Sequence, residues 1–290
     1  MGGSLLSQDQ RVAYLGPKGT FTHLAAQQLF LDDQLSSYQS IPACIEAVAS
    51  KRVSYAIVPL ENALEGTVPL TIDYLFHEAE LYVVGEVLTP IEQHLLVHPQ
   101  QAKNWETLTD IYSHPHALAQ CHKYLYNHFH GVPLHETAST AAAAKYIAEH
   151  PNECIGAIGN KAAAETYKLK IVERYIHDFH FNHTRFFILA NENQRLLQQG
   201  HEEQIKTTLM IELPSDRSGA LHQILSVFAW RQINLSKIES RPLKTGLGDY
   251  FFTLDVLEDE NAPMMRGAME ELAALDCTVK TLGSYFTYKK

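Results

Sequence analysis

Four polar segments of the chain lie at the ends of apolar runs, and they carry residue types that bind or protonate an anion. They are residues 16–22, 59–67, 112–120 and 182–187. Their glycines allow close approach to a ligand, and their hydroxyl, amide and guanidinium groups form directed hydrogen bonds. In open α/β sheets, ligands bind beyond the carboxyl ends of the strands. We therefore expect these segments to line a cleft.

Each segment also has a purely structural interpretation. Thr20 could cap a helix, Asn62 could satisfy backbone donors in a loop, and Ser113 could cap the helix that follows it. Arg185 could form a surface ion pair that contributes little to stability. The residue types alone leave both interpretations open.

Histidines and cysteines in this chain give only weak indications of chemistry. His114 and His116 could indicate a metal site, but no third ligand stands at a helical or hairpin spacing, so we expect no metal. The four cysteines are far apart and form no C-x-x-C pair, so we expect reduced thiols. Cys121 lies beside one polar segment, but no evident base would activate it as a nucleophile.

The elements that must position the polar segments alternate between strand-like and helix-like patterns. We expect strands at residues 11–15, 54–59, 81–87, 93–97, 110–113, 154–158 and 186–190. We expect helices at residues 20–30, 40–49, 67–79, 115–129, 139–147 and from 160 onward. This alternation predicts mainly parallel sheets.

The economical architecture for these elements is a two-lobed α/β catalytic unit over residues 11–190, with a central cleft like that of periplasmic binding proteins. Lobe one would comprise about residues 11–89 and 176–190, and lobe two about residues 90–175. A polar linker would follow at residues 191–206.

A second pattern begins after this linker and predicts a separate small domain over residues 207–288. It has strand-like runs at 207–213, 235–241, 249–257 and 278–287, and helix-like runs at 219–229 and 262–275. The glycines at 246 and 248 indicate a hairpin turn. The order β-α-β-β-α-β is that of a ferredoxin-like module.

Composition and charge restrict the class of protein. The 290 residues carry a net charge of −10, which argues against a nucleic-acid binder. No apolar run approaches the roughly 20 residues of a membrane helix. Residues 1–10 lack both a basic start and a long apolar stretch, so we expect no signal peptide and a cytoplasmic location. An anionic substrate would need local cations and helix N-termini to override the overall negative field.

The four segments match a known set of motifs in their order and spacing. Residues 16–22 read G-P-K-G-T-F-T, residues 58–66 read V-P-L-E-N-A-L-E-G, residues 112–121 read Y-S-H-P-H-A-L-A-Q-C and residues 184–186 read T-R-F. Together they resemble the motifs of the prephenate dehydratase family. Residues 219–221 (G-A-L) and 239–242 (E-S-R-P) resemble an ACT regulatory domain. One departure is Ala63, where relatives usually carry serine.

This resemblance implies an enzyme that converts prephenate to phenylpyruvate, carbon dioxide and water without a metal or other cofactor. The residues with implied catalytic roles are Thr184, Glu61, Asn62, Ser113 and Gln120. Those that would bind the substrate are Thr20, Arg185 and Phe186. Thr184 would donate a hydrogen bond to the leaving hydroxyl, because a threonine is a poor free-standing acid. Glu61 would be a proton donor if a dry cleft raises its pKa.

The ACT resemblance implies allosteric control by phenylalanine. The residues expected to bind it are Gly219, Ala220, Leu221, Asn234, Leu235, Glu239, Ser240, Arg241 and Pro242. The helix start can offer backbone N–H groups to the carboxylate of phenylalanine. Alternatively, these residues only build the turns of the module. ACT-type modules commonly pair across a two-fold axis, so we expect a homodimer or a homotetramer.

Two other functions stay open at this point. Arogenate dehydratase runs the same chemistry on the amino-acid analogue, and nothing in the motifs separates a keto from an amino side chain. A non-catalytic carboxylate sensor would share the two-lobed architecture. Only ten residues precede Arg11, too few for the chorismate mutase domain that is fused to some relatives, so we expect a monofunctional chain.

Overall fold

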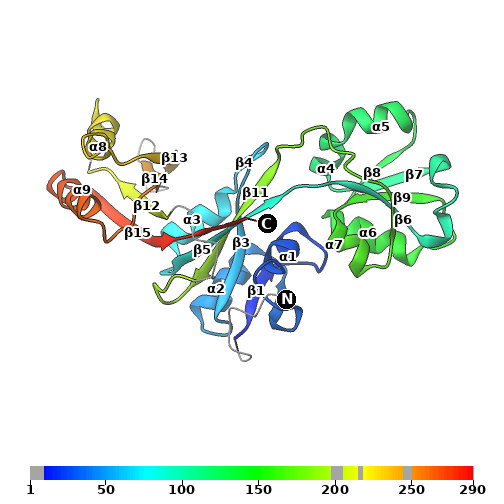
Figure 1. Ribbon diagram of the computed structural model, residues 1–290, viewed down its shortest axis with the longest axis horizontal. Coiled ribbons are helices and arrows are strands. Elements are labelled where there is room, and N and C mark those ends of the chain that lie inside the picture. Colours follow the sequence, from blue (N-terminus) through cyan, green and yellow to red (C-terminus); the bar gives the residue numbers. More distant parts are fainter. Residues whose placement is uncertain (1–9, 197–204, 215–217, 244–249, 290) are drawn as a thin grey trace.

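The computed structural model describes residues 10–196, 205–214, 218–243 and 250–289, and these residues form three sheets in a row (Figure 1). Lobe one lies in the middle, lobe two on one side of it and the C-terminal domain on the other. The predicted two-lobed α/β unit with a separate β-α-β-β-α-β domain is confirmed. No helix in these ranges is long and apolar enough to cross a membrane.

Lobe one contains a mixed sheet with the strand order β16-β5-β11-β3-β1-β2, and β4 pairs with β3. Its strands are β1 (Val12–Leu15), β2 (Leu35–Tyr38), β3 (Tyr55–Asn62), β4 (Gly66–Thr67), β5 (Tyr82–Pro90), β11 (His183–Ala190) and β16 (Thr287–Lys289). Its helices are α1 (Phe21–Ala26), α2 (Ile41–Ala49) and α3 (Pro69–His77), with a short 3-10 turn at Asp32–Gln34. The hydroxyl of Ser40 caps the N-terminus of α2 by accepting a hydrogen bond from the amide of Ala43.

Lobe two has the strand order β10-β6-β9-β7-β8. Its strands are β6 (His94–Val97), β7 (Asp110–Ser113), β8 (Leu134–Glu136), β9 (Ile155–Gly159) and β10 (Lys170–Glu173). Its helices are α4 (Pro115–Gln120), α5 (His122–His128), α6 (Thr140–Glu149) and α7 (Lys161–Thr166), with 3-10 turns at Pro99–Gln101 and Trp105–Thr107. The single helix predicted over residues 115–129 is wrong, because the backbone leaves the helical region at Cys121 and divides it.

The prediction of mainly parallel sheets is also wrong, and the reason is the path of the chain between the lobes. The chain leaves lobe one through β5 and returns to it through β11, so these strands run in opposite directions. They lie side by side over their full length. Strand β11 is also antiparallel to β3, whereas β1 is parallel to both β2 and β3. Figure 1 shows the two connecting segments spanning the space between the lobes.

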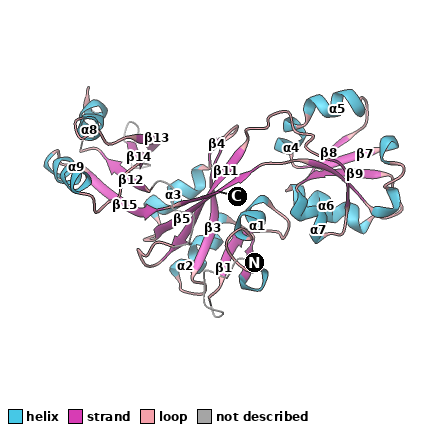
Figure 2. Cartoon of the chain, viewed as in Figure 1, coloured by secondary structure: helices cyan, strands magenta, loops and turns pink. Residues whose placement is uncertain are grey.

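The C-terminal domain has the ferredoxin-like strand order β13-β14-β12-β15. Its elements are β12 (Lys206–Glu212), α8 (Ala220–Ala229), β13 (Leu235–Pro242), β14 (Tyr250–Val256), α9 (Pro263–Ala274) and β15 (Thr278–Tyr285). The predicted hairpin turn at residues 246–248 lies outside the described residues. Figure 2 shows α8 and α9 on the outer side of this sheet, away from lobe one.

The inner face of the C-terminal sheet packs directly on lobe one. Phe251 stacks on Phe76 with ring centroids 3.8 Å apart, and Tyr285 is fully buried in a core that both parts share. Gly283 allows a close approach of the two backbones, because a Cβ atom there would lie 2.7 Å from the carbonyl oxygen of Val83. The two parts therefore form one continuous apolar core.

The last strand was predicted to belong wholly to the C-terminal domain, but the structure divides it. After β15 the chain continues into lobe one, where β16 pairs in parallel with β5. Tyr288 on β16 is buried in the core of lobe one. A chain cut before Thr207 would therefore lose a strand of the catalytic lobe's own sheet together with the C-terminal domain.

Candidate active site

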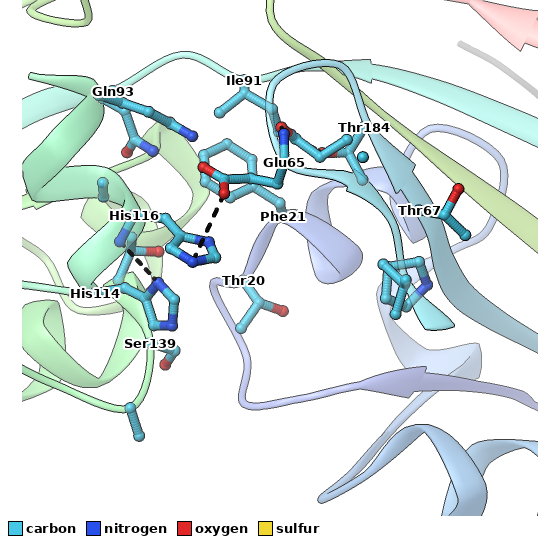
Figure 3. Close-up of a pocket in the computed structure, with 18 of the residues that line it drawn as sticks. Thr20, Phe21, Glu65, Thr67, Ile91, Gln93, His114, His116, Ser139 and Thr184 are labelled. Carbon is cyan, nitrogen blue, oxygen red and sulfur yellow. Dashed lines mark hydrogen bonds and ion pairs between the residues drawn. The ribbon is translucent and has the colours of Figure 1, made fainter. Parts of the chain in front are cut away.

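A cavity of about 500 Å³ lies between the two lobes, within the size range of small-molecule sites. Both lobes contribute side chains to it, as Figure 3 shows. The lining residues of lobe one include Thr20, Asn62, Glu65, Thr67 and Thr184. Those of the hinge and lobe two include Gln93, His114, His116, Gln120 and Ser139.

Asn62 and Thr184 are direct partners in the pairing of β3 with β11. The side-chain Nδ2 of Asn62 donates to Oγ1 of Thr184 over 2.8 Å. Oδ1 of Asn62 accepts from the amides of Leu64 and Glu65, at 3.0 and 3.2 Å. These two donors fix the orientation of the amide group, because only its oxygen can accept from them.

The fixed amide of Asn62 decides what Thr184 can do. Since Oγ1 of Thr184 accepts from Asn62, its own proton is available to a further acceptor. No acceptor for that proton is found among the described residues. Thr184 lines the cavity, although only 8% of the residue is exposed. The pair therefore presents a hydroxyl donor to a bound molecule.

Thr20 lines the cavity but uses its hydroxyl within the protein. Its Oγ1 caps α1 by accepting from the amide of His23 over 3.3 Å and donates to the carbonyl of Leu15 over 3.1 Å. The buried His23 accepts from the amide of Gly19, which holds the loop before the helix. The first amides of a helix have no partner inside it, so the start of α1 offers N–H groups beside the cavity.

Lobe two presents an amide and two imidazoles. Gln120, the last residue of α4, lines the cavity. His114 caps α4 through a weak bond from the amide of His116, and burial, reinforced by His116, lowers the pKa of His114. His116 reaches across the cleft to Glu65 at 3.8 Å, drawn as a dashed line in Figure 3. No group of three potential ligands that could hold a metal occurs in the described ranges.

Ser113 was expected to orient the substrate, but the structure places it outside the cavity lining. It is fully buried, and its hydroxyl donates to the carbonyl of Ile158 over 2.7 Å. This bond ties β7 to β9 directly before the start of α4. Ser113 thus supports the loop of His114 from behind.

Arg185, Glu61 and Phe186 do not line the cavity either. Successive residues of a strand point to opposite faces, so Arg185 lies on the face opposite to Thr184. Its guanidinium bonds Glu61 at 2.7 Å and Asp255 at 2.6 Å. Phe186 is 1% exposed and packs in the core of lobe one. Arg185 is therefore held by ion pairs on the face of the strand that points away from the cavity.

The prediction of a raised pKa for Glu61 is wrong. Burial would raise the pKa of Glu61, but the ammonium of Lys237 and the guanidinium of Arg185 outweigh it and hold the pKa below its ordinary value. A carboxyl group in this state is ionised near neutral pH and has no proton to donate. The sequence alone could not show this, because Lys237 lies in the other domain.

Gln93 is a cavity residue that sequence reasoning missed. It lies at the hinge between β5 and β6, it is 2% exposed, and its Oε1 has no partner among the described residues. A buried, unpaired amide oxygen is rare in proteins and is expected to find a partner. The available signal was a single amide directly before the apolar run of β6.

Cys121 is no candidate nucleophile. Its thiol is fully buried and burial raises its pKa, so the reactive thiolate is disfavoured. All four cysteines are free thiols.

The residues expected to bind phenylalanine fall into two groups in the C-terminal domain. Gly219 is the N-cap of α8, with a left-handed backbone (φ +86°) and open space around it. On β13, Ser240 and Pro242 are exposed, whereas Glu239 bonds Thr67 and Arg241 bonds Asp73, both in lobe one. The main-chain oxygen of Asn234 already accepts from the amide of Leu257. The strand of the E-S-R-P motif therefore contacts lobe one with one face only.

The fold and the cavity define a two-lobed catalytic unit with an attached ACT-type module. A family model for prephenate dehydratase matches residues 12–194, and one for the ACT domain matches residues 207–274. A relative from Bacillus subtilis named prephenate dehydratase is 52% identical over 96% of this chain and 99% of its own length.

Two solved structures are similar over nearly the whole chain. One is a prephenate dehydratase from Arthrobacter aurescens in complex with L-Phe, with a TM-score of 0.83 and 31% identity over 95% of this chain and 90% of that one. The other is described as a novel type of quorum quenching acylase, with a TM-score of 0.83 and 28% identity over 96% and 98%. The chain belongs to the prephenate dehydratase family, it carries an ACT domain, and it is a lyase.

Replacing Arg185 by lysine tests whether this residue binds the substrate. A lysine cannot bond three carboxylates in the directions of the guanidinium fork. We expect the thermal midpoint to fall by roughly 4 °C or more, because charged hydrogen bonds are lost. We expect kcat to fall, while KM for prephenate stays within about twofold. Calorimetry and steady-state kinetics measure both; a large rise in KM at an unchanged thermal midpoint would assign Arg185 to substrate binding.

Proposed function

We propose that prephenate binds in the cavity between the lobes and that Thr184 assists the departure of its ring hydroxyl. The observation that supports this most is the hydrogen bond from Asn62 to Thr184, which leaves the threonine proton free to point into the cavity. The bond between the ring and its carboxylate breaks, and carbon dioxide leaves. The electron pair of this carbon–carbon bond moves into the ring as the carbon–oxygen bond to the hydroxyl breaks. The hydroxyl leaves with one added proton as water, and the product ring becomes aromatic.

The Thr184 hydroxyl acts in the transition state. Negative charge develops on the departing oxygen, so a hydrogen bond to it strengthens as the carbon–oxygen bond breaks. A threonine does not need to become an anion for this, and solvent can supply the proton that leaves as water. Asn62 contributes by orienting the hydroxyl.

The two carboxylates of prephenate need binding groups, and no lysine or arginine is found among the described residues that line the cavity. The available groups are main-chain amides at the starts of α1 and α6 and the imidazoles of His114 and His116. Helix N-termini favour anions through their free N–H groups and the helix dipole. Gln120 and Gln93 can bond the remaining polar atoms of the substrate.

The function is tested by offering prephenate and arogenate in parallel to the wild-type protein and to Thr184→Ala. We expect turnover of prephenate to phenylpyruvate, with kcat of the alanine variant lowered about 100-fold or more and KM changed only modestly. Faster turnover of arogenate would establish the alternative dehydratase. No turnover of either substrate would support a non-catalytic sensor, and a kcat within about threefold of wild type would remove Thr184 from the mechanism.

Asn62→Asp tests the orientation of the Thr184 proton. One carboxylate oxygen can still accept from the amides of Leu64 and Glu65, so we expect the loop to keep its fold. The other oxygen accepts from Thr184 and turns its proton away from the cavity. We therefore expect kcat to fall about as far as in Thr184→Ala, by roughly 100-fold. A kcat close to wild type, with the thermal midpoint unchanged, would contradict the assigned orientation.

We also propose that phenylalanine binds at the ACT domain near Gly219 and the exposed face of β13, and that copies of the chain pair there as a homodimer or homotetramer in the cytoplasm. For inhibition, phenylalanine must bind the less active state more tightly than the active one. The domain packs on lobe one through a shared core, which provides a physical contact for such a change.

Gly219→Val tests this site, and the chain offers a matched control. Valine is strained at a positive φ and its side chain obstructs the start of α8. We expect phenylalanine affinity, measured by calorimetry, to fall about tenfold or more. Gly131 in lobe two has nearly the same backbone (φ +85°) and equally open surroundings. Gly131→Val should show the same strain and keep wild-type inhibition; equal loss of inhibition in both variants would place the regulatory site elsewhere.

A further inference from the structure

A cluster of charged residues lies directly behind the strands that carry Asn62 and Thr184. Glu61, next to Asn62, bonds Arg185, next to Thr184, over 2.7 Å. Lys237 of the ACT strand β13 lies 3.1 Å from the same carboxylate of Glu61. The Asn62–Thr184 pair and the Glu61–Arg185 pair are therefore successive residue pairs in the pairing of β3 with β11.

Thr67 connects the cavity to the ACT domain in a single side chain. It lines the cavity and pairs with Glu61 through β4. Its hydroxyl accepts from Nζ of Lys237 over 2.7 Å and donates to the carboxylate of Glu239. Lys237 and Glu239 are themselves 3.3 Å apart. A movement of β13 relative to lobe one must therefore either move Thr67 and Glu61 or break these bonds.

Buried ion pairs strengthen the contact between the ACT domain and lobe one. Glu86 and Asp255, both 1% exposed, complete the surroundings of Arg185 at 2.5 and 2.6 Å. Lys206 of the ACT domain and Thr287 of β16 hold the other oxygen of Glu86 at 2.8 and 2.9 Å. An ion that loses its partner in such a site stays desolvated and uncompensated, so separation of the two parts is strongly disfavoured.

The same strand carries several of the residues expected to bind phenylalanine, from Leu235 to Pro242. Glu239 and Lys237 point at lobe one, whereas Ser240 and Ile238, which alternate with them along β13, are exposed on the other face. A ligand that binds the exposed face and shifts β13 would act on the inner face of the same strand. No second element is required between the regulator and the catalytic strands.

We propose that Lys237 and Glu239 of the ACT domain are positioning residues for the Asn62–Thr184 pair, and that phenylalanine changes turnover through this contact. They do not contact the substrate. They bond Thr67 and Glu61, and these two residues fix the position of the neighbouring Asn62–Thr184 pair, which presents the threonine hydroxyl. The inference rests on the proposed function. The ACT domain is thus part of the catalytic framework even when no regulator is bound.

Lys237→Met in the full chain tests the inference, because it removes the ammonium and keeps much of the side-chain volume. We expect kcat to fall roughly tenfold, since a small misplacement of a catalytic group has effects of this order, with KM within about twofold. We expect phenylalanine to bind with wild-type affinity by calorimetry but to inhibit less at saturation. Lys237→Arg, which keeps the charge, should restore most of the kcat and of the inhibition.

Lys280→Met is the matched control. Lys280 also crosses from the ACT domain to lobe one, where it bonds the carbonyls of Leu75 and Ala79 and the carboxylate of Glu80. It does not contact the catalytic strands, so its loss should lower the thermal midpoint without changing kcat or maximal inhibition.

The possible outcomes separate this inference from the function on which it rests. Equal changes of kcat and inhibition in Lys237→Met and Lys280→Met, or wild-type values in both, would overturn the positioning role while the wild-type activity stands. Loss of phenylalanine binding in Lys237→Met would place Lys237 in the regulatory site itself and also overturn it. A wild-type protein that neither turns over prephenate nor responds to phenylalanine would overturn both.

Discussion

The pairing of β3 with β11 is the constraint on which the site and its control both depend. In paired strands, side chains of neighbouring residues point to opposite faces, and cross-strand partners lie on the same face. Asn62 and Thr184 consequently meet on the cleft face, while Glu61 and Arg185 meet on the face covered by the ACT domain. One strand register therefore places the Thr184 hydroxyl at the cavity and Arg185 at the contact with the ACT domain.

The charged side chains and the cavity lie on opposite faces of this strand pair. Arg185, Lys206 and Lys237 lie behind the sheet, where they form ion pairs with Glu86 and Glu61. Burial would raise the pKa of Glu86, but Arg185 and Lys206 outweigh it and hold the pKa below its ordinary value, so Glu86 stays ionised at neutral pH. The cavity is left with helix starts, amides and imidazoles for a dianion, in a chain whose net charge is −10. In the proposed mechanism, dipoles and hydrogen bonds rather than fixed charge would hold the substrate.

The sequence was sufficient to predict the lobes, the small domain and part of the site. Thr20, Asn62, Gln120 and Thr184 line the cavity, as expected for polar groups beyond strand ends. Arg185 and Phe186 do not, and strand alternation after Thr184 could have indicated this for Arg185. Phe186 lies on the same face of β11 as Thr184 but two residues further from the cleft, where it packs in the core of lobe one with Ala25 and Ala26 of α1.

Other features depend on contacts between residues far apart in the chain, and no local pattern reveals them. The lowered pKa of Glu61 results from Lys237, 176 positions later, and Asp255 meets Arg185 only after the ACT domain has docked. The strand β16 is short and follows β15 almost without a break, so periodicity could not assign it to another sheet. The mixed sheets result from the return path of the chain, which the alternation of strands and helices does not specify.

Hydrogen–deuterium exchange with and without phenylalanine tests the central claim most directly, since it reports the opening of individual backbone segments. If β13 acts on the catalytic strands through Thr67 and Glu61, phenylalanine will change the protection of residues 58–67 and 183–187 as well as that of the ACT domain. The change should not extend to the distant strands of lobe two. A change confined to residues 205–285, in a protein whose activity phenylalanine inhibits, would contradict the account.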